Sequence, residues 1–435
     1  YVPLIGGLEA TSFLGYETGN AAGRVLAIVR DGELVDEAGE GQDVEVFLDS
    51  SPFYAESGGQ VGDSGSIVSE TGTVRVDDTQ FSLPGIHGHR GTVAVGTIKV
   101  GQDTEVAIDS ARRERIRKNH TGTHILHWAL RDIIGDHVQQ AGSLVAPDRL
   151  RFDFSHYEAP DPDVLVGVEE VTNHRVISND AVTTVETSKQ EAEAMGALAF
   201  FGDKYGEDVR VVRTGDYSVE FCGGTHVTST GQVGPVVVLS EGSVGANLRR
   251  MEALTGVSAY EHLVAVRQSL TEAEGILRAQ PGQLLTAART LTERVDDVEQ
   301  RLATFESRAR SQAAGGLADS AESHGEWGLV VAEADVDDAD SLRMLALQIR
   351  EKVTGIGVLG AAIDGKGSLI AYVSPELAAR GVSAGELIAD AAREMGGGGS
   401  RDPELAQAGG PRGDQVGAAL EKAREVARAA LMDLE

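Results

Sequence analysis

The 435-residue sequence is poor in cysteine, in long apolar runs and in positive charge. Its single cysteine, Cys222, excludes an intrachain disulfide and fits a reducing cytosol, where a thiolate can bind a metal. No stretch approaches the roughly 18–20 apolar residues of a membrane-spanning helix. No signal peptide is recognisable either, so we expect a cytoplasmic protein with no membrane partner. The hydrophobic content of 41% is sufficient for hydrophobic cores, and the length predicts two to four domains.

The formal net charge of -30 argues against a nucleic-acid partner, because affinity for a phosphate backbone comes chiefly from Lys and Arg side chains. A local basic cluster nevertheless stands immediately before the first histidine motif. It consists of Arg112, Arg113, Arg115, Arg117 and Lys118. Such a cluster could dock a polyanion. The alternative is that Glu114 and other acidic neighbours neutralise it on a solvated helix face.

Two histidine motifs lie about a hundred residues apart, and they read NHTGTHILH and FCGGTHV. His120 and His124 are four residues apart in a segment that we expect to be helical, so both imidazoles can reach one ion. Cys222 and His226 would complete the ligand set from another element. Imidazoles combined with one thiolate suit zinc best among the common divalent metals, which predicts one Zn²⁺ ion. The alternatives are two surface histidines on one helical face and a small buried cysteine.

Three further segments accompany these motifs: SPFYAESGGQVGD at residues 51–63, LRFDFSH at 150–156 and GSVGANLRRMEALTG at 242–256. Together the five segments resemble the editing domain of alanyl-tRNA synthetase, and the resemblance covers nearly the whole chain. It implies an aminoacyl-tRNA deacylase that hydrolyses the ester joining serine or glycine to alanine tRNA. A pocket that accepts alanine rejects its near-isosteres by only about 10²-fold or less, so a second, hydrolytic site is physically warranted.

The first residue is tyrosine, and we interpret the chain as a piece of a longer protein whose aminoacylation domain is missing in cis. No nucleotide-binding signature occurs in the sequence, so we expect that this piece alone does not aminoacylate. Two alternatives remain open: a free-standing editing factor that acts in trans, and a non-catalytic tRNA-binding module stiffened by zinc. A DHH-type phosphoesterase fits only the C-terminal part, since its aspartate and histidine metal motifs are absent.

The resemblance also implies roles for individual residues. His120, His124, Cys222 and His226 would be the catalytic, zinc-binding set, although His226 could be the fourth ligand or a base outside the ligand shell. Three ligands with an open position make a catalytic zinc site, and four make a structural one. Gln140 and Thr123 would contact the substrate amino acid. The residues expected to bind tRNA are Arg112, Arg113, Arg117, Lys118, Arg249, Arg250, Gly397, Gly398, Arg401 and Gln407.

The pattern of the chain predicts a multidomain α+β protein with four regions. Residues 1–106 alternate short β-rich runs with turns, as in a small barrel or sandwich, and we expect the barrel. Residues 107–256 predict helices packed on an antiparallel sheet, an α+β editing domain that contains the zinc. Residues 257–315 carry heptads on two helices, which either fold back at a proline turn as an antiparallel coiled coil or self-associate with another chain.

Residues 316–435 predict a small α/β domain that contains a glycine-rich segment at 396–410. This segment resembles the C-terminal, DHHA1-like domain of the synthetase, which implies a grip on the body of the tRNA. Consecutive glycines expose backbone N-H groups that can hold phosphate. The alternative is an ordinary flexible loop.

Overall fold

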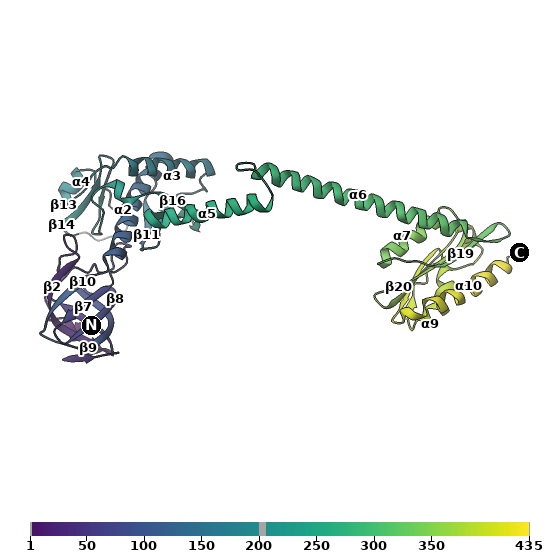
Figure 1. The fold of residues 1–435 in the computed structure, drawn as a ribbon, viewed down its shortest axis with the longest axis horizontal. Coiled ribbons are helices and arrows are strands. Elements are labelled where there is room, and N and C mark those ends of the chain that lie inside the picture. The colour runs from purple at the N-terminus through teal and green to yellow at the C-terminus, as the bar shows by residue number, and fades with distance from the viewer. Residues whose placement is uncertain (1, 200–205, 435) are drawn as a thin grey trace. The chain divides into compact units, whose positions relative to one another are not determined.

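The computed structural model describes residues 2–199 and 206–434. The chain divides into two compact units, residues 1–272 and 273–435, each built from both helices and strands (Figure 1). The predicted mixed α+β, multidomain organisation is therefore confirmed. Among the helices of the described ranges, none combines the length and apolarity that a bilayer crossing requires.

A closed β-barrel begins the first unit, as predicted. Its six strands are β2 (Asn20–Arg30), β5 (Asp43–Leu48), β7 (Gly65–Ser69), β8 (Gly72–Leu83), β9 (Ile86–Lys99) and β10 (Asp103–Ile108). They pair in the order β10-β7-β8-β9-β5-β2, and an antiparallel ladder between β10 and β2 closes the ring. Buried side chains alternate with more exposed ones along the strands. On β8, for example, Val74 and Val76 are buried and Arg75 between them is exposed, and the buried side chains fill the interior of the barrel.

The long helix α2 (Ser110–Ile134) follows the barrel and passes through the centre of the next domain. Asp109 caps it by accepting a hydrogen bond from the backbone N-H of Arg112. Every residue from 119 to 127 is buried, so the first histidine motif lies in the interior. Because both faces of this part of α2 are covered, the protein must satisfy each of its polar side chains internally.

Two antiparallel sheets and a second helix surround α2. One sheet has the strand order β11 (Gln140–Val145), β12 (Leu150–Ser155), β17 (Leu248–Thr255) and β16 (Val236–Gly245). The other has the order β13 (Val182–Ser188), β14 (Asp208–Thr214) and β15 (Ser218–Phe221). Helix α3 (Pro162–Ile177) packs against α2, and together with the first sheet they enclose one hydrophobic core. This arrangement is the helix-on-antiparallel-sheet domain that the sequence predicts.

The heptad region forms two helices, α5 (Gly256–Ile276) and α6 (Leu284–Asp319). Five apolar heptad side chains of α6 are 46–70% exposed: Leu291, Val295, Val298, Leu302 and Phe305. Almost all of α5 belongs to the first unit and α6 to the second. Their pairing as an antiparallel coiled coil therefore stays a prediction.

The second unit contains a six-stranded sheet with helices on both faces. The strand order is β18 (Glu322–His324), β19 (Trp327–Glu333), β20 (Gly355–Ile363), β21 (Lys366–Val373), β23 (Leu405–Gly410) and β22 (Gly398–Gly399). Helices α9 (Ala384–Glu394) and α10 (Val416–Met432) cover one face, and α7 (Ala339–Arg350) covers the other. The neighbouring residues Val358 and Leu359 of β20 belong to these two separate cores, as alternation along a strand requires.

Candidate metal centre

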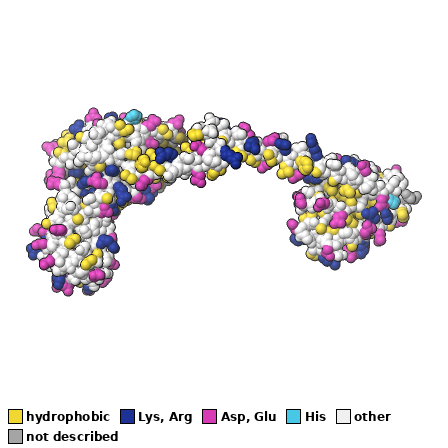
Figure 2. Space-filling view, viewed as in Figure 1, with side chains coloured by type: hydrophobic (Ala, Val, Ile, Leu, Met, Phe, Trp, Pro, Cys, Tyr) yellow, Lys and Arg dark blue, Asp and Glu magenta, His cyan; other side chains and the backbone are white. Residues whose placement is uncertain are grey.

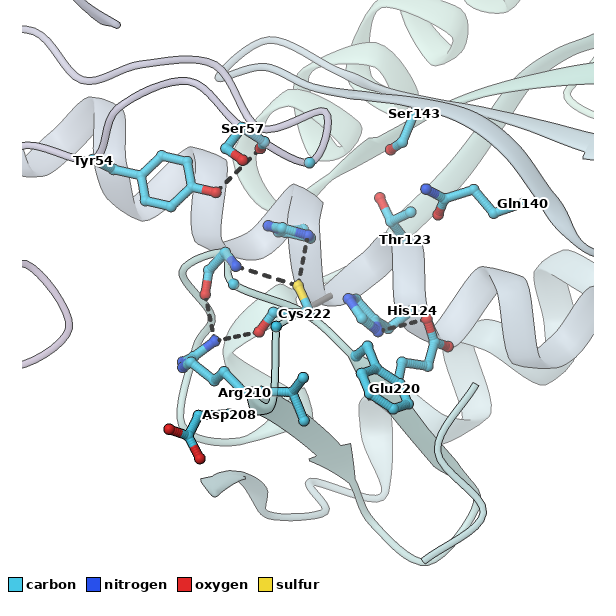
Figure 3. A pocket seen from close by; sticks show the side chains of 17 residues that line it. Tyr54, Ser57, Thr123, His124, Gln140, Ser143, Asp208, Arg210, Glu220 and Cys222 are labelled. Carbon is cyan, nitrogen blue, oxygen red and sulfur yellow. Dashed lines mark hydrogen bonds and ion pairs between the residues drawn. The ribbon is translucent and has the colours of Figure 1, made fainter. Parts of the chain in front are cut away.

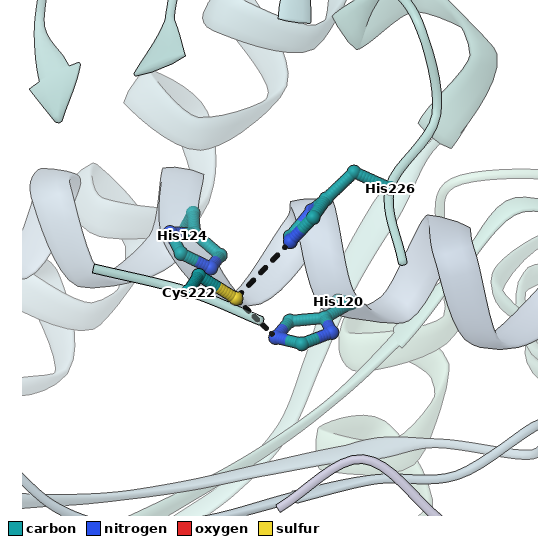
Figure 4. A group of neighbouring side chains, drawn as sticks. All are labelled: His120, His124, Cys222 and His226. Carbon is teal, nitrogen blue, oxygen red and sulfur yellow. Dashed lines mark hydrogen bonds between the residues drawn. The ribbon is translucent and has the colours of Figure 1, made fainter. Parts of the chain in front are cut away.

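Four side chains from the two histidine motifs converge on one point (Figure 4). His120 and His124 come from consecutive turns of α2, whereas Cys222 and His226 come from the loop that follows β15. One ligand atom from each of the four lies within 4.8 Å of the others. Cys222 Sγ is 3.4 Å from His120 Nε2 and 3.3 Å from His226 Nε2. The structure thus brings together the whole predicted ligand set.

Hydrogen bonds at Nδ1 orient two of the three imidazoles. His120 Nδ1 lies 2.8 Å from Gln60 Oε1, and an amide oxygen only accepts, so Nδ1 carries the proton. The backbone N-H of Thr225 donates to the same oxygen at 2.8 Å, which fixes the amide. His226 Nδ1 lies 3.0 Å from Thr121 Oγ1. Both rings therefore direct Nε2 toward the sulfur, as metal-binding histidines do when an outer partner holds the other nitrogen.

The third imidazole faces a buried carboxylate. His124 Nδ1 lies 3.0 Å from Glu220 Oε2, which is the distance of an ion pair without the alignment of a hydrogen bond. Glu220 also contacts His127 Nδ1 at 3.2 Å and accepts a hydrogen bond from Ser218 Oγ at 3.1 Å. Burial raises the pKa of Glu220, but the charges of His124 and His127 outweigh it and hold that pKa well below its ordinary value. Glu220 was not predicted from the sequence, because no spacing rule marks a residue that acts through a neighbour.

Cys222 and His226 are in the protonation states that a cation requires, whereas His124 is not. Burial raises the pKa of the Cys222 thiol, but His120 and His226 outweigh it and lower that pKa well below its ordinary value. Burial lowers the pKa of His226 to about 3, so this imidazole is neutral. Burial also disfavours charge on His124, but Glu220 overcomes it and raises the pKa to about 10. Zinc ligands must be a thiolate and neutral imidazoles, so binding would release the proton of His124.

A cavity of about 420 Å³ borders the cluster (Figure 3). The predicted substrate residues Gln140 and Thr123 both line it, and so do Ser57, Gly58 and Ser143. Ser57 and Gly58 belong to the barrel, so the predicted SGGQ loop reaches the cavity. The barrel and the α+β domain therefore build this cavity together.

Arginine and glycine hold the Cys222 loop in place. Arg210 Nη1 donates hydrogen bonds to the carbonyl oxygens of Cys222 and Gly224, at 2.9 and 2.8 Å. A Cβ atom on Gly224 would overlap the His120 ring, whereas one on Gly223 would meet no atom within 4 Å. Gly224 is thus required for the approach of the loop to α2. No sequence motif marks Arg210, which lies on β14, twelve positions before the cysteine.

Arg113 corrects one expectation. Only 1% of this side chain is exposed, and its guanidinium pairs with Asp63 and donates to the carbonyl oxygens of Gly15 and Pro52. It joins α2 to the barrel. The expectation that Arg113 binds tRNA is therefore not met, because a side chain without exposed surface cannot contact a phosphate.

Several other expected tRNA contacts in the first unit have acidic partners. Arg117 pairs with Glu114 at 2.8 Å, which is the alternative considered for the basic cluster. Arg249 pairs with Glu241 at 2.5 Å and Arg250 pairs with Asp153 at 2.7 Å. The Arg112 guanidinium donates to the Gly62 carbonyl oxygen at 2.7 Å, and Lys118 is half-buried. Acidic and basic side chains are interspersed on the visible face of each unit (Figure 2).

In the second unit the glycine-rich segment forms part of the sheet. Gly398 belongs to the short edge strand β22, which pairs with β23. A Cβ atom on Gly397 would overlap the carbonyl oxygen of Gly409, so this glycine allows two chain segments to approach closely. Arg401 and Gln407 are exposed nearby. Their role in tRNA binding stays a prediction.

Two family models match parts of the chain. The model of tRNA synthetases class II (A) matches residues 6–112. The model of the threonyl and alanyl tRNA synthetase second additional domain matches residues 209–252, which include Cys222 and His226.

Similarity to individual proteins extends over almost the whole chain. The alanine-tRNA ligase of Acetivibrio thermocellus is 41% identical over 418 residues, which make up 96% of this chain and 47% of that protein. The alanine-tRNA ligase of Chloroflexus aurantiacus is 41% identical over 432 residues, or 96% of this chain and 48% of that protein. The chain thus spans about half the length of the curated relatives it matches. The crystal structure of the C-Ala domain from Aquifex aeolicus alanyl-tRNA synthetase matches 25% of this chain and 97% of its own, with 26% identity and a TM-score of 0.22.

Proposed function

Since the chain belongs to the alanyl-tRNA synthetase family, we propose that it carries the editing activity, the hydrolysis of the ester between a wrong amino acid and the 3' end of alanine tRNA. The wrong amino acids would be serine and glycine. One observation carries the proposal: three imidazoles and a thiolate meet in one cluster, and three of its members, His120, His124 and Cys222, line a cavity together with Gln140 and Thr123.

We propose zinc as the cofactor, held by His120, His124, Cys222 and His226. The fit rests on the donor chemistry, on the separation of less than 4.8 Å and on the outer contacts to Nδ1 of each imidazole. When bound, zinc supplies Lewis acidity toward a carbonyl oxygen or a water. With His226 as a ligand the shell is closed, and without it one position stays open for substrate.

The residues around the cavity would bind and discriminate the aminoacyl group. The Gln140 amide offers a donor and an acceptor to the hydroxyl of serine. Alanine has a hydrogen atom in place of that hydroxyl, so it would leave the amide unpaired, and sites built in this way discriminate strongly. Thr123 Oγ1 donates to the Asn119 carbonyl oxygen at 2.8 Å, which leaves its oxygen free to accept.

The second unit would bind the body of the tRNA through the segment that contains Gly397, Gly398, Arg401 and Gln407, with α6 as a spacer. The same editing chemistry would serve a free-standing factor acting in trans. A second candidate function is a tRNA-binding module in which zinc is only structural. The presence of four candidate ligands favours this alternative, because closed four-ligand sites are structural.

The test is deacylation of serine-charged and alanine-charged alanine tRNA by the chain, with zinc quantified in the same sample. We expect loss of serine but not of alanine, and we expect Cys222→Ala to abolish both zinc binding and hydrolysis. Bound zinc without hydrolysis of the serine ester would contradict the editing proposal and leave the structural module.

A further inference from the structure

Three aromatic rings contact one another just after β12, beside the sheet that carries Gln140. The ring centroids of His137 and Tyr157 lie 5.5 Å apart with planes only 24° from parallel. The His156 ring lies 5.1 Å from that of His137 and 4.9 Å from that of Tyr157. We call these three residues the aromatic platform.

Hydrogen bonds hold the platform in place. His137 Nε2 lies 2.9 Å from His156 Nδ1, so the two imidazoles bond to each other. The Ser155 hydroxyl donates to the His137 carbonyl oxygen at 2.7 Å, and the His156 N-H donates to the Asn247 carbonyl oxygen at 3.0 Å. Each of the two imidazoles is thus fixed through both its ring and its backbone.

The platform is exposed on one side and supported on the other. Tyr157 is 70% exposed and His137 is exposed, whereas His156 beneath them is only 7% exposed. A single exposed aromatic residue is ordinary on a protein surface. Here two exposed rings lie nearly parallel to each other and contact a third, buried ring. The two exposed rings fill no core, and they offer a surface of the kind on which nucleobases stack.

The platform adjoins the cavity of the proposed active site. Gln140, which lines the cavity, is three residues from His137, and three residues span at most about 10 Å. Gln140 pairs with Phe154 across the sheet, and the Ser155 N-H donates to the Gln139 carbonyl oxygen at 3.0 Å. The segments that carry His137 and His156 therefore run side by side next to Gln140. A nucleotide chain that leaves the cavity past Gln140 reaches the platform within one or two nucleotides.

We propose that the aromatic platform stacks an unpaired base of the single-stranded 3' end of the RNA, next to the nucleotide that carries the ester. This inference rests on the proposed function. Arg117, Arg249 and Arg250 are occupied by carboxylates, so binding near the cavity would depend on stacking more than on charge. Stacking tolerates any base, since every base has a π-face.

The test uses an RNA hairpin that mimics the acceptor stem, with a fluorescent base analogue at each unpaired 3' position in turn, and the full chain. We expect quenching at a position before the terminal nucleotide. Tyr157→Phe should preserve the quenching, because the ring remains, whereas Tyr157→Leu should remove it and weaken binding about 5- to 100-fold. The matched control is Tyr260→Leu on α5, where the tyrosine is 60% exposed and lies outside the stack.

The outcomes separate the platform from the proposed function. Equal quenching and affinity in Tyr157→Leu and wild type would overturn the platform, whether or not the serine ester is hydrolysed. Position-dependent quenching that requires the Tyr157 ring would support the platform even if hydrolysis failed, and the editing proposal alone would then fall. Melting temperature and zinc content are measured for each variant, and His137→Ala provides a second ring deletion if Tyr157→Leu unfolds.

Discussion

Two of the glycine-rich segments of the chain, the Cys222 loop and the segment around β22, differ in what their glycines approach. In the Cys222 loop, Gly224 lies against the His120 ring and lets a thiolate and imidazoles share one centre. In the second unit, Gly397 lies against the Gly409 backbone and lets two segments of a sheet approach. The first glycine brings buried polar side chains together, whereas the second brings only backbone together.

This difference shows why a glycine motif alone predicts a close approach but not a ligand site. The Cys222 loop is surrounded by partners that fix ring nitrogens and carbonyl oxygens, among them Gln60, Glu220 and Arg210. Around β22 the side chains of Arg401 and Gln407 are exposed. We therefore expect a glycine substitution in the Cys222 loop to weaken metal binding, and one beside β22 to lower stability.

The largest effect is expected for Gly224→Ala. The new Cβ would overlap the His120 ring, which must then leave Gln60 and the shared centre. Zinc affinity should fall by about 100-fold or more, beyond the 10- to 100-fold typical of losing an outer partner, and ester hydrolysis should fall with it. Competition with a chelator measures the affinity. Gly223→Ala, whose Cβ meets no atom within 4 Å, should still bind zinc, and normal zinc affinity in Gly224→Ala would contradict the prediction.

Gly397→Ala should give the next largest effect, on stability alone. Its Cβ would overlap the Gly409 carbonyl oxygen, so β22 must separate from β23. We expect the free energy of unfolding of the second unit to fall by about 2–3 kcal/mol, measured by urea denaturation, with unchanged zinc affinity. Gly398→Ala has open space and should change stability by less than about 0.5 kcal/mol. If Gly397→Ala and Gly398→Ala lowered the free energy of unfolding equally, the close approach of Gly397 to Gly409 would not explain the loss.

A smaller effect is expected for Glu220→Gln, which keeps the shape of the side chain but removes the charge facing His124. Loss of this outer partner should lower zinc affinity about 10- to 100-fold, and excess zinc should restore hydrolysis. Glu114→Gln, on the exposed part of α2, is the control. If zinc affinity were unchanged in Glu220→Gln, the carboxylate would have no role in orienting the imidazole.

The sequence predicted the parts of the site that have a local spacing. The i, i+4 pair on α2 and the CGGTH segment each repeat a recognisable interval, and alternation predicted the barrel. Gln60, Arg210 and Glu220 act only through tertiary contacts, so no interval marks them. Arg113 shows the converse, because a run of basic residues does not reveal that one of them turns inward to Asp63. The pairing of α5 with α6 stays a prediction, since the two helices fall largely in separate units.

The smallest effect extends the comparison to histidines that are buried but share no centre. In the barrel, His89 Nδ1 bonds to the Val46 carbonyl oxygen at 2.9 Å and Nε2 to Ser51 Oγ at 2.7 Å. Burial lowers the pKa of His89 from 6.5 to about 4. Between pH 4 and pH 6.5, His89 binds a proton in the unfolded chain but not in the folded barrel. The free energy of unfolding therefore rises with pH in this range, and the contribution of His89 is lost as the pH falls below about 6.5.

Acidification from pH 7 to 5.5 should therefore cost the barrel about 1 kcal/mol through His89 alone. Urea denaturation of the first unit at the two pH values measures this loss. Zinc is removed beforehand, so that the Cys222 cluster contributes equally in the wild type and in the variant. His89→Gln keeps an amide donor and acceptor for both partners but does not titrate, so its loss should be smaller by that amount. An identical pH dependence in the variant and the wild type would show that His89 does not make the barrel sensitive to acid. The contrast with the histidines of the Cys222 cluster would then rest on geometry alone.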